Sequence, residues 1–233
     1  MGRDHLSEIS NAFVSQGFQL TPLAQHNLGS CNRLIMLDTS YIELLGWEKD
    51  KPILRAEIAN QAIGLDALVF RTQDADACYS QLKEAGFAVN PVQDLSRKAE
   101  YFSEPVLVQF KTVRFSEQPI PGLRIYFCEH LTPEYVWQKQ WIAHPNQIQC
   151  LSQITLSSPD ITQTAAIFKR LLNLPKQSVI SDFNTARICL PNIELIIQSA
   201  DGSHNVSILN ARLSRSLLHP VDFIIDHHFF THY

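Results

Sequence analysis

A short sequence phrase that occurs more than once is the feature that most constrains the fold of this chain. Residues 13–22 and 82–91 each contain the end of an amphipathic helix, a glycine, a short apolar segment and a proline. A weaker third copy covers residues 168–175. Internal repetition is typical of a chain built from repeated supersecondary units. We therefore expect duplicated βα-type modules, with any active site where modules face each other.

Apolar periodicity divides the chain into three such modules. In the first, a helix at 5–16 is followed by predicted strands at 18–20, 33–37 and 41–45. In the second, a strand at 65–72 and a helix ending at Gly86 are followed by strands at 87–89, 106–114 and 123–128. In the third, a strand at 153–157 and a helix ending near Leu172 are followed by strands near 178–180, 186–190, 193–198 and 204–213. Modules two and three therefore read β-α-β-β-β, and module one reads as the same unit without its first strand.

This pattern predicts an α+β protein of tandem βαβββ modules. We expect a paired unit over residues 1–130, made of modules at 5–46 and 64–129. A connector at 131–150 leads to a third module with a C-terminal strand and tail at 151–233.

Composition disfavours several classes of function. The net charge of −4 comes from scattered acids and bases, whereas a nucleic-acid-binding protein normally has a clustered basic face. No apolar run approaches the roughly 18–20 residues that cross a bilayer, and the first residues lack the apolar region of a secretory signal. The five cysteines are widely spaced and odd in number, as expected of thiols in a reducing cytoplasm. We therefore expect a cytoplasmic protein with no nucleic-acid or membrane partner.

Motifs of several enzyme classes are also missing from the sequence. It contains no GxSxG, HExxH, P-loop or GxGxxG motif. Standard nucleophilic hydrolases, nucleotide kinases and Rossmann dehydrogenases are thereby disfavoured.

An ordered set of short matches resembles the vicinal oxygen chelate superfamily of glyoxalases, bleomycin-resistance proteins and dioxygenases, and more closely its glyoxalase-like branch. The matches within residues 5–200 are Gly17-Phe18, His26, Gly29-Ser30 with Asn32, Tyr41-Ile42-Glu43-Leu44-Leu45, Gly64-Leu65, Arg71-Thr72 with Asp74, Leu82 with Gly86-Phe87, and His144-Pro145-Asn146. The resemblance implies that two βαβββ modules pair, so that their mixed sheets form a cup that holds a small-molecule ligand.

The resemblance also implies metal ligands on the first and last strands of each paired module. Only Glu43 matches such a position directly, and Asp66 stands where glyoxalase I has a histidine. The last strand of module two offers Tyr126 or Cys128, and the first strand of module one is absent. The expected cofactor is therefore at most one divalent metal ion, with Glu43 as its ligand.

Two residues are candidate catalytic groups. Glu43 lies among apolar neighbours, where a carboxylate is costly to bury unless it is paired, hydrogen-bonded or metal-bound. We interpret it as a base or metal ligand, and the alternative is a solvated residue on the sheet face. His26 lies in a polar loop, where it is either a general base or a surface histidine.

Four residues are candidate substrate-binding groups. Asn32 would orient a substrate or cap a turn. Asp66 is either a cavity-facing acid or an exposed one at a strand start. Arg114 would bind an anionic group or form a surface ion pair with a neighbouring strand. His144 would close over the cup or stabilise a turn.

Two other features are expected to carry no active site. Glu194 repeats the position of Glu43 in module three, but that module has no complete partner, so its site should be degenerate. The tail histidines His227, His228 and His232 are expected to belong to an anchored chain end rather than to a metal site.

The leading hypothesis is a glyoxalase-like small-molecule enzyme with Glu43 in the cup, acting by metal-assisted proton abstraction or a related reaction. The first alternative is a non-catalytic protein that sequesters a small molecule in the same cup. The second is an inactive remnant truncated at its N-terminus. Because module one lacks a strand, its open edge should pair with a second copy in a homodimer, or with the strand at 204–213.

Overall fold

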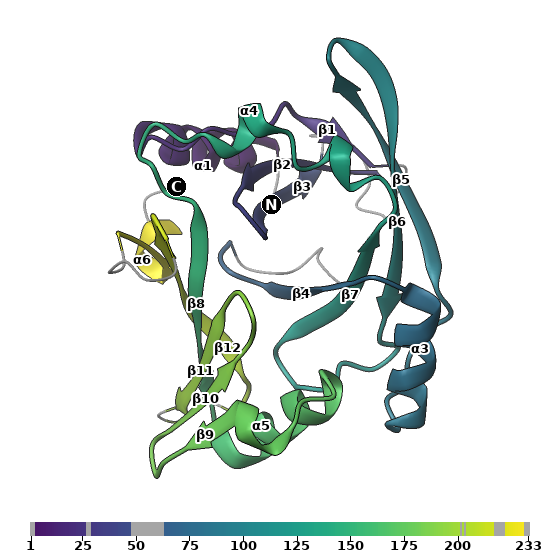
Figure 1. The fold of residues 1–233 in the computed structure, drawn as a ribbon. Helices are drawn as coiled ribbons and strands as arrows, with labels where there is room; N and C mark the ends of the chain where they lie inside the picture. The colour runs from purple at the N-terminus through teal and green to yellow at the C-terminus, as the bar shows by residue number, and fades with distance from the viewer. Residues whose placement is uncertain are drawn as a thin grey trace.

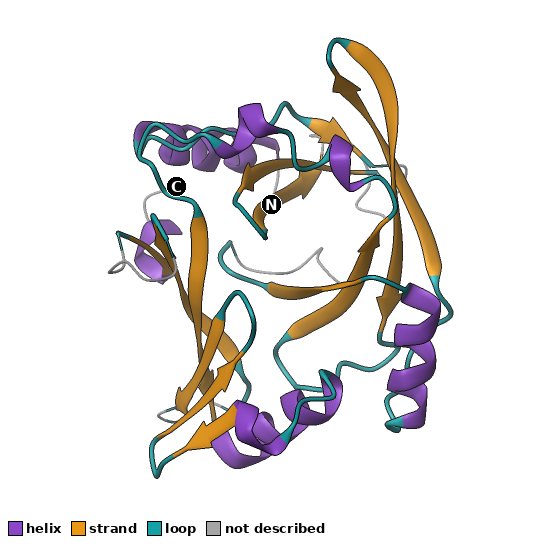
Figure 2. Ribbon diagram, in the orientation of Figure 1, coloured by secondary structure: helices purple, strands orange, loops and turns teal. Residues whose placement is uncertain are grey.

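Three β-sheets with helices on their outer faces make up the fold (Figure 1, Figure 2). The computed structural model describes residues 3–26, 29–47, 63–200, 202, 204–216 and 222–230. The first sheet has the order β1-β2-β3, formed by Ala24–Gln25, Ser30–Met36 and Tyr41–Trp47. The second has the order β4-β7-β6-β5, where β4 is Ala67–Thr72, β5 is Gln93–Tyr101, β6 is Glu104–Arg114 and β7 is Arg124–His130.

The third sheet has the order β13-β12-β8-β11-β10-β9. Its strands are β8 (Cys150–Ser158), β9 (Val179–Ser181), β10 (Thr185–Cys189), β11 (Glu194–Ser199), β12 (Ser207–Ser214) and β13 (Phe223–Asp226). The helices are α1 (Arg3–Ser15), α3 (Ala75–Glu84), α4 (Lys139–Ile142), α5 (Ile161–Leu171) and α6 (His227–Phe230), with 3₁₀ turns η1 (Pro133–Tyr135) and η2 (Lys176–Ser178). None of the described helices is long and apolar enough to span a membrane.

The strand pairing confirms an α+β fold of tandem βαβββ modules. In module two the first strand β4 runs parallel to the last strand β7, and β6 and β5 continue the sheet antiparallel. Module three repeats this arrangement, with β8 parallel to β11 and with β10 and β9 beyond it. A helix covers the connection from first to second strand in both modules, as parallel pairing requires.

The repeated sequence phrase forms the same helix ending three times. After α1 the N–H of Phe18 donates to the carbonyl of Phe13, and after α3 the N–H of Phe87 donates to that of Leu82. Gly17 and Gly86 have φ of +79° and +81°. After α5, Asn173 takes the left-handed position with φ of +49°. These are Schellman endings, in which a left-handed residue allows the chain to turn back and satisfy the last helical carbonyls.

Two predicted strands do not form as expected, and strand β5 forms without having been predicted. Residues 18–20 form no strand, and the predicted strand at 87–89 is a single bridge from Val89 to Phe115. Strand β5 was not predicted, yet it pairs with β6 along its whole length. Its sequence is mostly polar, and the side chain that it buries most is Arg97, so the usual apolar alternation is missing.

The first two sheets meet edge to edge and form a cup. An antiparallel bridge between His26 and Arg97 joins the β1 side of the first sheet to β5. The combined order is therefore β3-β2-β1 followed by β5-β6-β7-β4, with β3 and β4 at the two ends. Among the described residues, no strand pairs with β3 on the side away from β2.

The C-terminal strand does not fill this edge, so that part of the prediction is wrong. Strand β12 pairs antiparallel with β8 and with β13, inside the third sheet. The strand is most buried toward its C-terminal end, and β8 pairs with it from Ser207 to Ser214. A second copy of the chain as the partner of β3 stays a prediction.

Module three packs firmly on module two. Phe168 of α5 is fully buried and lies edge-on to Phe70 of β4, with ring centroids 6.3 Å apart. Near the β6–β7 turn, the N–H of Val206 donates to the carbonyl of Pro121 at 3.0 Å. Gly122 beside it has φ of +84°, and a Cβ there would lie 2.6 Å from the carbonyl oxygen of Val206. The close backbone contact therefore requires a glycine.

Candidate functional site

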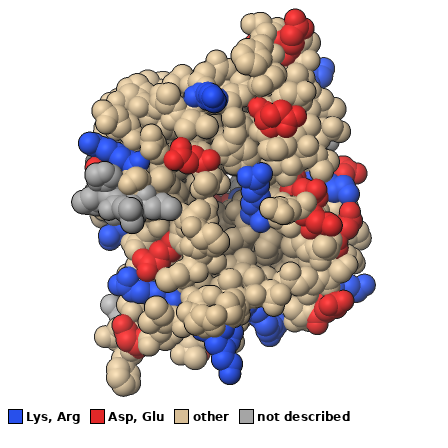
Figure 3. Space-filling view, viewed as in Figure 1, with Lys and Arg blue, Asp and Glu red and all other residues tan. Residues whose placement is uncertain are grey.

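A cavity of about 880 Å³ lies between the edges of the cup and the inner face of the third sheet. Strands β3, β4 and β7 line it on the cup side, and β8, β11 and β12 line it on the other. Figure 3 shows a hollow near the centre of this face, with basic side-chain atoms at its rim. The volume falls within the range of small-molecule sites in proteins.

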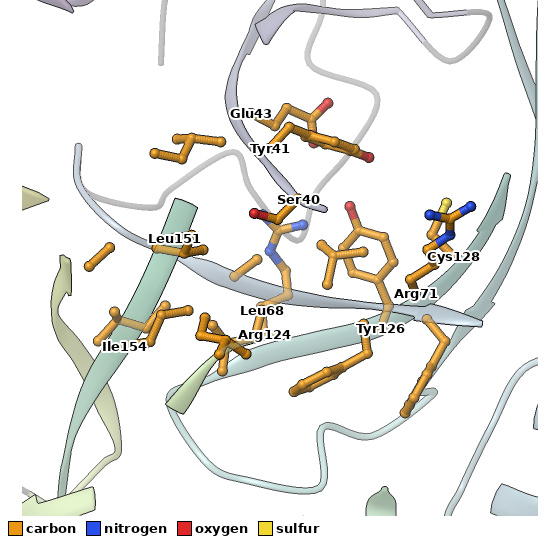
Figure 4. Close-up of a pocket in the computed structure, with 18 of the residues that line it drawn as sticks. Ser40, Tyr41, Glu43, Leu68, Arg71, Arg124, Tyr126, Cys128, Leu151 and Ile154 are labelled. Carbon is orange, nitrogen blue, oxygen red and sulfur yellow. The ribbon is translucent and has the colours of Figure 1, made fainter. Parts of the chain in front are cut away.

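Glu43 lines this cavity from β3, on the same strand face as Tyr41 (Figure 4). Its Oε1 accepts a 2.7 Å hydrogen bond from Nδ2 of Asn32, which lies on the neighbouring strand β2. Asn32 is only 3% exposed, and its own Oδ1 is buried without a partner among the described residues. The amide therefore fixes one carboxylate oxygen of Glu43 and leaves the other available to a ligand.

Two phenols and a thiol line the cavity near Glu43. Tyr126 and Cys128 lie two residues apart on β7, and Figure 4 shows the Tyr126 hydroxyl pointing toward Tyr41 and Glu43. Burial, reinforced by the negative charge of Glu43, raises the pKa of the Cys128 thiol to about 12 and raises the pKa of Tyr126. Burial also raises the pKa of Tyr41 well above its usual value. All three groups are therefore protonated near neutral pH and can donate hydrogen bonds.

His130 completes the β7 side of the cavity. Its Nε2 lies 3.3 Å from the hydroxyl of Tyr41, and its ring contacts that of Trp137. Burial, followed by the positive charges of Arg71 and Arg97, lowers the pKa of His130 to about 4. The imidazole is therefore neutral near pH 7.

The buried His130 makes stability depend on pH in a predictable direction. Its folded pKa of about 4 lies below the ordinary value of 6.5, so the unfolded chain takes up a proton first as the pH falls. We expect the free energy of unfolding to drop between about pH 6.5 and pH 4, by at most about 3 kcal/mol from this group. Urea unfolding at several pH values measures this. His130→Gln should flatten the pH dependence in that window, and an unchanged slope in the variant would contradict the assignment.

Three guanidinium groups surround the polar end of the cavity. Arg71 of β4 lies over the ring of Trp137, 4.9 Å from its centroid. Arg124 of β7 is paired with Asp66, with 2.8 Å between Nε and Oδ2. Arg97 of β5 is buried outside the cavity lining, where burial lowers the pKa of its guanidinium and the nearby Tyr41 and Glu43 partly offset that effect. The cavity lining itself carries the guanidinium groups of Arg71 and Arg124 and the carboxylates of Glu43, Asp66 and Asp74, so its charges are of both signs.

The structure brings together three of the six residues that the sequence suggested. Glu43 and Asp66 line the cavity, and Asn32 holds Glu43. Asp66 is engaged by Arg124, so its carboxylate positions that guanidinium rather than standing free.

The other three do not line the cavity. His26 belongs to the β1–β2 turn, where Nδ1 lies 2.8 Å from the Ser30 hydroxyl. The guanidinium of Arg114 lies over the ring of Tyr126, 4.8 Å from its centroid, and so supports the cavity wall from behind. His144 is buried between the connector and the first module, and both of its ring nitrogens are bonded to backbone groups.

Sequence reasoning missed most of the polar end. Tyr41, Arg71, Tyr126, His130 and Trp137 all line the cavity. Tyr41 and Arg71 belong to segments that match the superfamily pattern, and Tyr126 is at a position where the superfamily has a metal ligand. The sequence analysis nevertheless assigned no role to any of the three. The available signal was strand alternation, because Tyr126, Cys128 and His130 share one face of β7.

The donor set around Glu43 does not fit a divalent metal ion. Among the described residues, no group of three or more His, Cys, Asp or Glu side chains converges as metal ligands. The groups near Glu43 are protonated phenols, a thiol with a raised pKa and the neutral imidazole of His130. Of these, the imidazole is a usual ligand of divalent cations, and a single imidazole beside one carboxylate falls short of the three or more ligands that such a site needs. The function proposed below therefore uses no metal ion.

The paired βαβββ modules and the cavity in their cup define a protein of the vicinal oxygen chelate superfamily. The sequence pattern of the glyoxalase-like domain matches residues 2–172, which include both paired modules and the first half of module three. The chain therefore belongs to the glyoxalase-like domain family.

Solved structures resemble the fold at low sequence identity. A hypothetical protein from Staphylococcus aureus is 14% identical, with a TM-score of 0.68 over 86% of this chain and 83% of that one. A mutant of 4-hydroxymandelate synthase from Streptomyces coelicolor is 13% identical, with a TM-score of 0.48 over 89% of this chain and 67% of that one. A comparison with curated protein sequences gave no match.

Proposed function

We propose that this chain is a small-molecule enzyme in which Glu43 acts as a general base, removing a proton from a carbon next to a carbonyl group. The observation that carries the proposal is the placement of one hydrogen-bonded carboxylate in a cavity beside protonated phenols. A general base has to reach the substrate proton, and a developing oxyanion needs donors that are already in place.

The chemistry follows from these groups. The C–H proton passes to the oxygen of Glu43 that Asn32 does not hold. The electron pair of the C–H bond forms a carbon–carbon double bond, and the π pair of the carbonyl group moves onto its oxygen. A hydroxyl of Tyr41 or Tyr126 donates to that oxygen as its negative charge grows. Return of a proton from Glu43 to the same carbon restores the carbonyl group and completes an exchange. Where the deprotonated carbon carries a hydroxyl group, passage of the hydroxyl proton to the first oxygen and return of the proton from Glu43 to the former carbonyl carbon completes an isomerisation.

The alternative is a non-catalytic protein that holds a small molecule in the same cavity. It is favoured by the apolar lining, since most of the residues that line the cavity have aliphatic or aromatic side chains. In that case the Glu43 charge serves at most as a hydrogen-bond acceptor. Removing the charge of Glu43 would then change no reaction rate, because the protein would catalyse no reaction.

Glu43→Gln separates the two functions, because glutamine keeps an acceptor for Asn32 and loses only the basic carboxylate. We expect the wild-type chain to exchange α-protons of some members of a panel of aldehydes, ketones and 2-oxo acids in D₂O, followed by NMR. We expect Glu43→Gln to slow that exchange by a factor of about 100 or more. Equal exchange in both proteins would refute the role of Glu43.

Glu194→Gln is the matched control. Glu194 is the first residue of β11 in module three, a position that corresponds to that of Glu43 on β3 in module one. Like Glu43, it is held by an amide, because Nε2 of Gln153 donates to Oε2 of Glu194 at 2.8 Å. It does not line the cavity. Its replacement should leave exchange unchanged. If ligands bind but no panel member exchanges in the wild type, the binding protein is the better description.

A further inference from the structure

The hydroxyl of Tyr41 and the imidazole of His130 form a pair in the wall of the cavity. The hydroxyl oxygen lies 3.3 Å from Nε2 of His130, and both residues line the cavity. Tyr41 is also on the same face of β3 as Glu43, and Figure 4 shows the two side chains next to each other. A substrate within reach of the carboxylate of Glu43 therefore lies close to this pair as well.

Aromatic packing fixes the orientation of both rings. The ring of Trp137 has its centroid 5.7 Å from that of Tyr41 and 4.9 Å from that of His130. Nε1 of Trp137 donates to the carbonyl of Leu37 at 3.2 Å, which ties this ring to the turn between β2 and β3. Phe110 packs edge-on against the other side of the wall, 5.2 Å from the His130 ring. Rings held in this way keep the hydroxyl and Nε2 in hydrogen-bonding geometry.

The position of one proton decides what this hydrogen bond does. A neutral imidazole carries a single N–H, so one ring nitrogen donates and the other accepts. If Nδ1 carries the proton, Nε2 accepts the O–H of Tyr41, and that O–H is lost to a substrate. If Nε2 carries the proton, it donates to the oxygen of Tyr41, and the O–H of Tyr41 is left for the substrate.

The surroundings of Nδ1 favour the second arrangement. Nδ1 of His130 is buried and has no hydrogen-bond partner among the described residues. A proton on Nδ1 would therefore create a buried N–H without an acceptor, whereas a proton on Nε2 leaves only a lone pair there. Buried N–H groups without a partner are rarer in proteins than acceptors that lack one.

The second phenol in the cavity is not held in the same way. Arg114 supports the ring of Tyr126 from behind, but the described part of the chain supplies no hydrogen-bond partner to its hydroxyl. The O–H of Tyr126 can therefore rotate about its C–O bond. A donor whose direction is already fixed stabilises a developing charge better than one that has to reorient.

We propose that His130 is a positioning residue, which donates from Nε2 to the oxygen of Tyr41 and so directs the O–H of Tyr41 to the substrate oxyanion. This rests on the proposed function and deepens it, because it assigns the oxyanion donor to Tyr41 rather than to Tyr126. The hydrogen bond that the phenol oxygen accepts also polarises its O–H and strengthens the bond to the growing charge.

The tautomer of His130 in the wild-type chain is the direct test. Long-range proton–nitrogen correlation NMR of protein labelled with ¹⁵N-histidine distinguishes an imidazole protonated on Nε2 from one protonated on Nδ1. The signals of His130 are those that disappear in His130→Gln. We expect the Nε2–H form near neutral pH. The Nδ1–H form would overturn the inference.

Substitutions of His130 test whether it acts through a donor at Nε2. Glutamine places its amide N–H near the Nε2 position, whereas the shorter asparagine does not reach it. His130→Asn should lower kcat for α-proton exchange about tenfold and change KM little, and His130→Gln should recover most of that loss. An equal loss in both folded variants would mean that the histidine serves packing alone.

A double-mutant cycle tests whether His130 acts through Tyr41. Tyr41→Phe should lower kcat about 100-fold, and Tyr126→Phe should cost at least tenfold less. Tyr41→Phe combined with His130→Asn should be no slower than Tyr41→Phe alone, since no hydroxyl is left to position. Losses that multiply would show that His130 acts independently of Tyr41. Tyr101→Phe is the control, because Tyr101 lies outside the cavity lining.

The outcome is separable from that of the Glu43 experiment. An Nδ1–H imidazole, or multiplying losses, would overturn the role of His130 even if exchange depends on Glu43 as proposed. An Nε2–H imidazole in a wild-type chain that exchanges no panel member would support the arrangement of Tyr41 and His130 and refute the enzyme.

Discussion

Replacing Phe168 by alanine is expected to lower the free energy of unfolding by about 3–5 kcal/mol, because it empties a fully buried aromatic site. Phe168 lies on α5 of module three, and its ring contacts Phe70 of module two. The cost therefore includes the packing between two modules as well as the lost burial of the ring. Urea unfolding followed by far-ultraviolet circular dichroism measures the loss.

Phe183→Ala provides the control for this substitution. Phe183 lies between β9 and β10 and is fully exposed, so its removal should change stability by no more than about 0.5 kcal/mol. Because Phe70 and Leu171 line the cavity next to Phe168, the core variant should also weaken ligand binding. A loss below about 1 kcal/mol in Phe168→Ala would mean that the modules do not depend on this contact.

Local sequence signals were sufficient to predict the modules. The helix endings at Gly17 and Gly86 could be read from sequence because a left-handed residue followed by an apolar one is a local requirement of the Schellman ending. Strand β5 gave no such signal. Its pairing with β6 is a hairpin contact, and its buried Arg97 interacts electrostatically with Tyr41 and Glu43, which lie on a strand far away in the sequence. Interactions between residues that are far apart in the sequence produce no periodic apolar pattern within the strand itself.

The candidate site was predicted in part, and the reason lies in where the side chains point. Glu43 was identifiable because a carboxylate among apolar strand residues needs a partner, and Asn32 provides it. His26 and Arg114 have the right chemistry for a site, but the fold places them in a turn and behind Tyr126. Residue type alone could not reveal this, because position relative to the cup depends on strand register and on how the two sheets join.

The role of module three could not have been predicted from a two-module cup. The edges of β3 and β4 are both unpaired within the described residues on the cavity side, and the third sheet faces the space between them. The cup is thereby extended by an apolar wall from a third module.

Replacing His144 by alanine is the second large effect, expected to lower the free energy of unfolding by about 3–5 kcal/mol. His144 is 6% exposed and joins two distant segments. Its Nδ1 accepts the N–H of Gln19 at 3.0 Å, so Nε2 carries the proton and donates to the carbonyl of Met36 at 2.8 Å. Removing the ring leaves both backbone groups buried without partners, at about 1–3 kcal/mol each, and also removes an edge-on contact with Phe18.

His144→Gln distinguishes hydrogen bonding from catalysis. A glutamine offers one donor and one acceptor, so it should recover part of the lost stability. If His144 is structural, cavity ligands should bind to folded His144→Gln with unchanged affinity, and α-proton exchange should proceed at the wild-type rate. If His144→Gln were as stable as the wild type but had lost α-proton exchange, His144 would instead be a residue of the active site. The geometry argues against that result, because a histidine with both nitrogens bound to the backbone has no donor or acceptor left for a substrate.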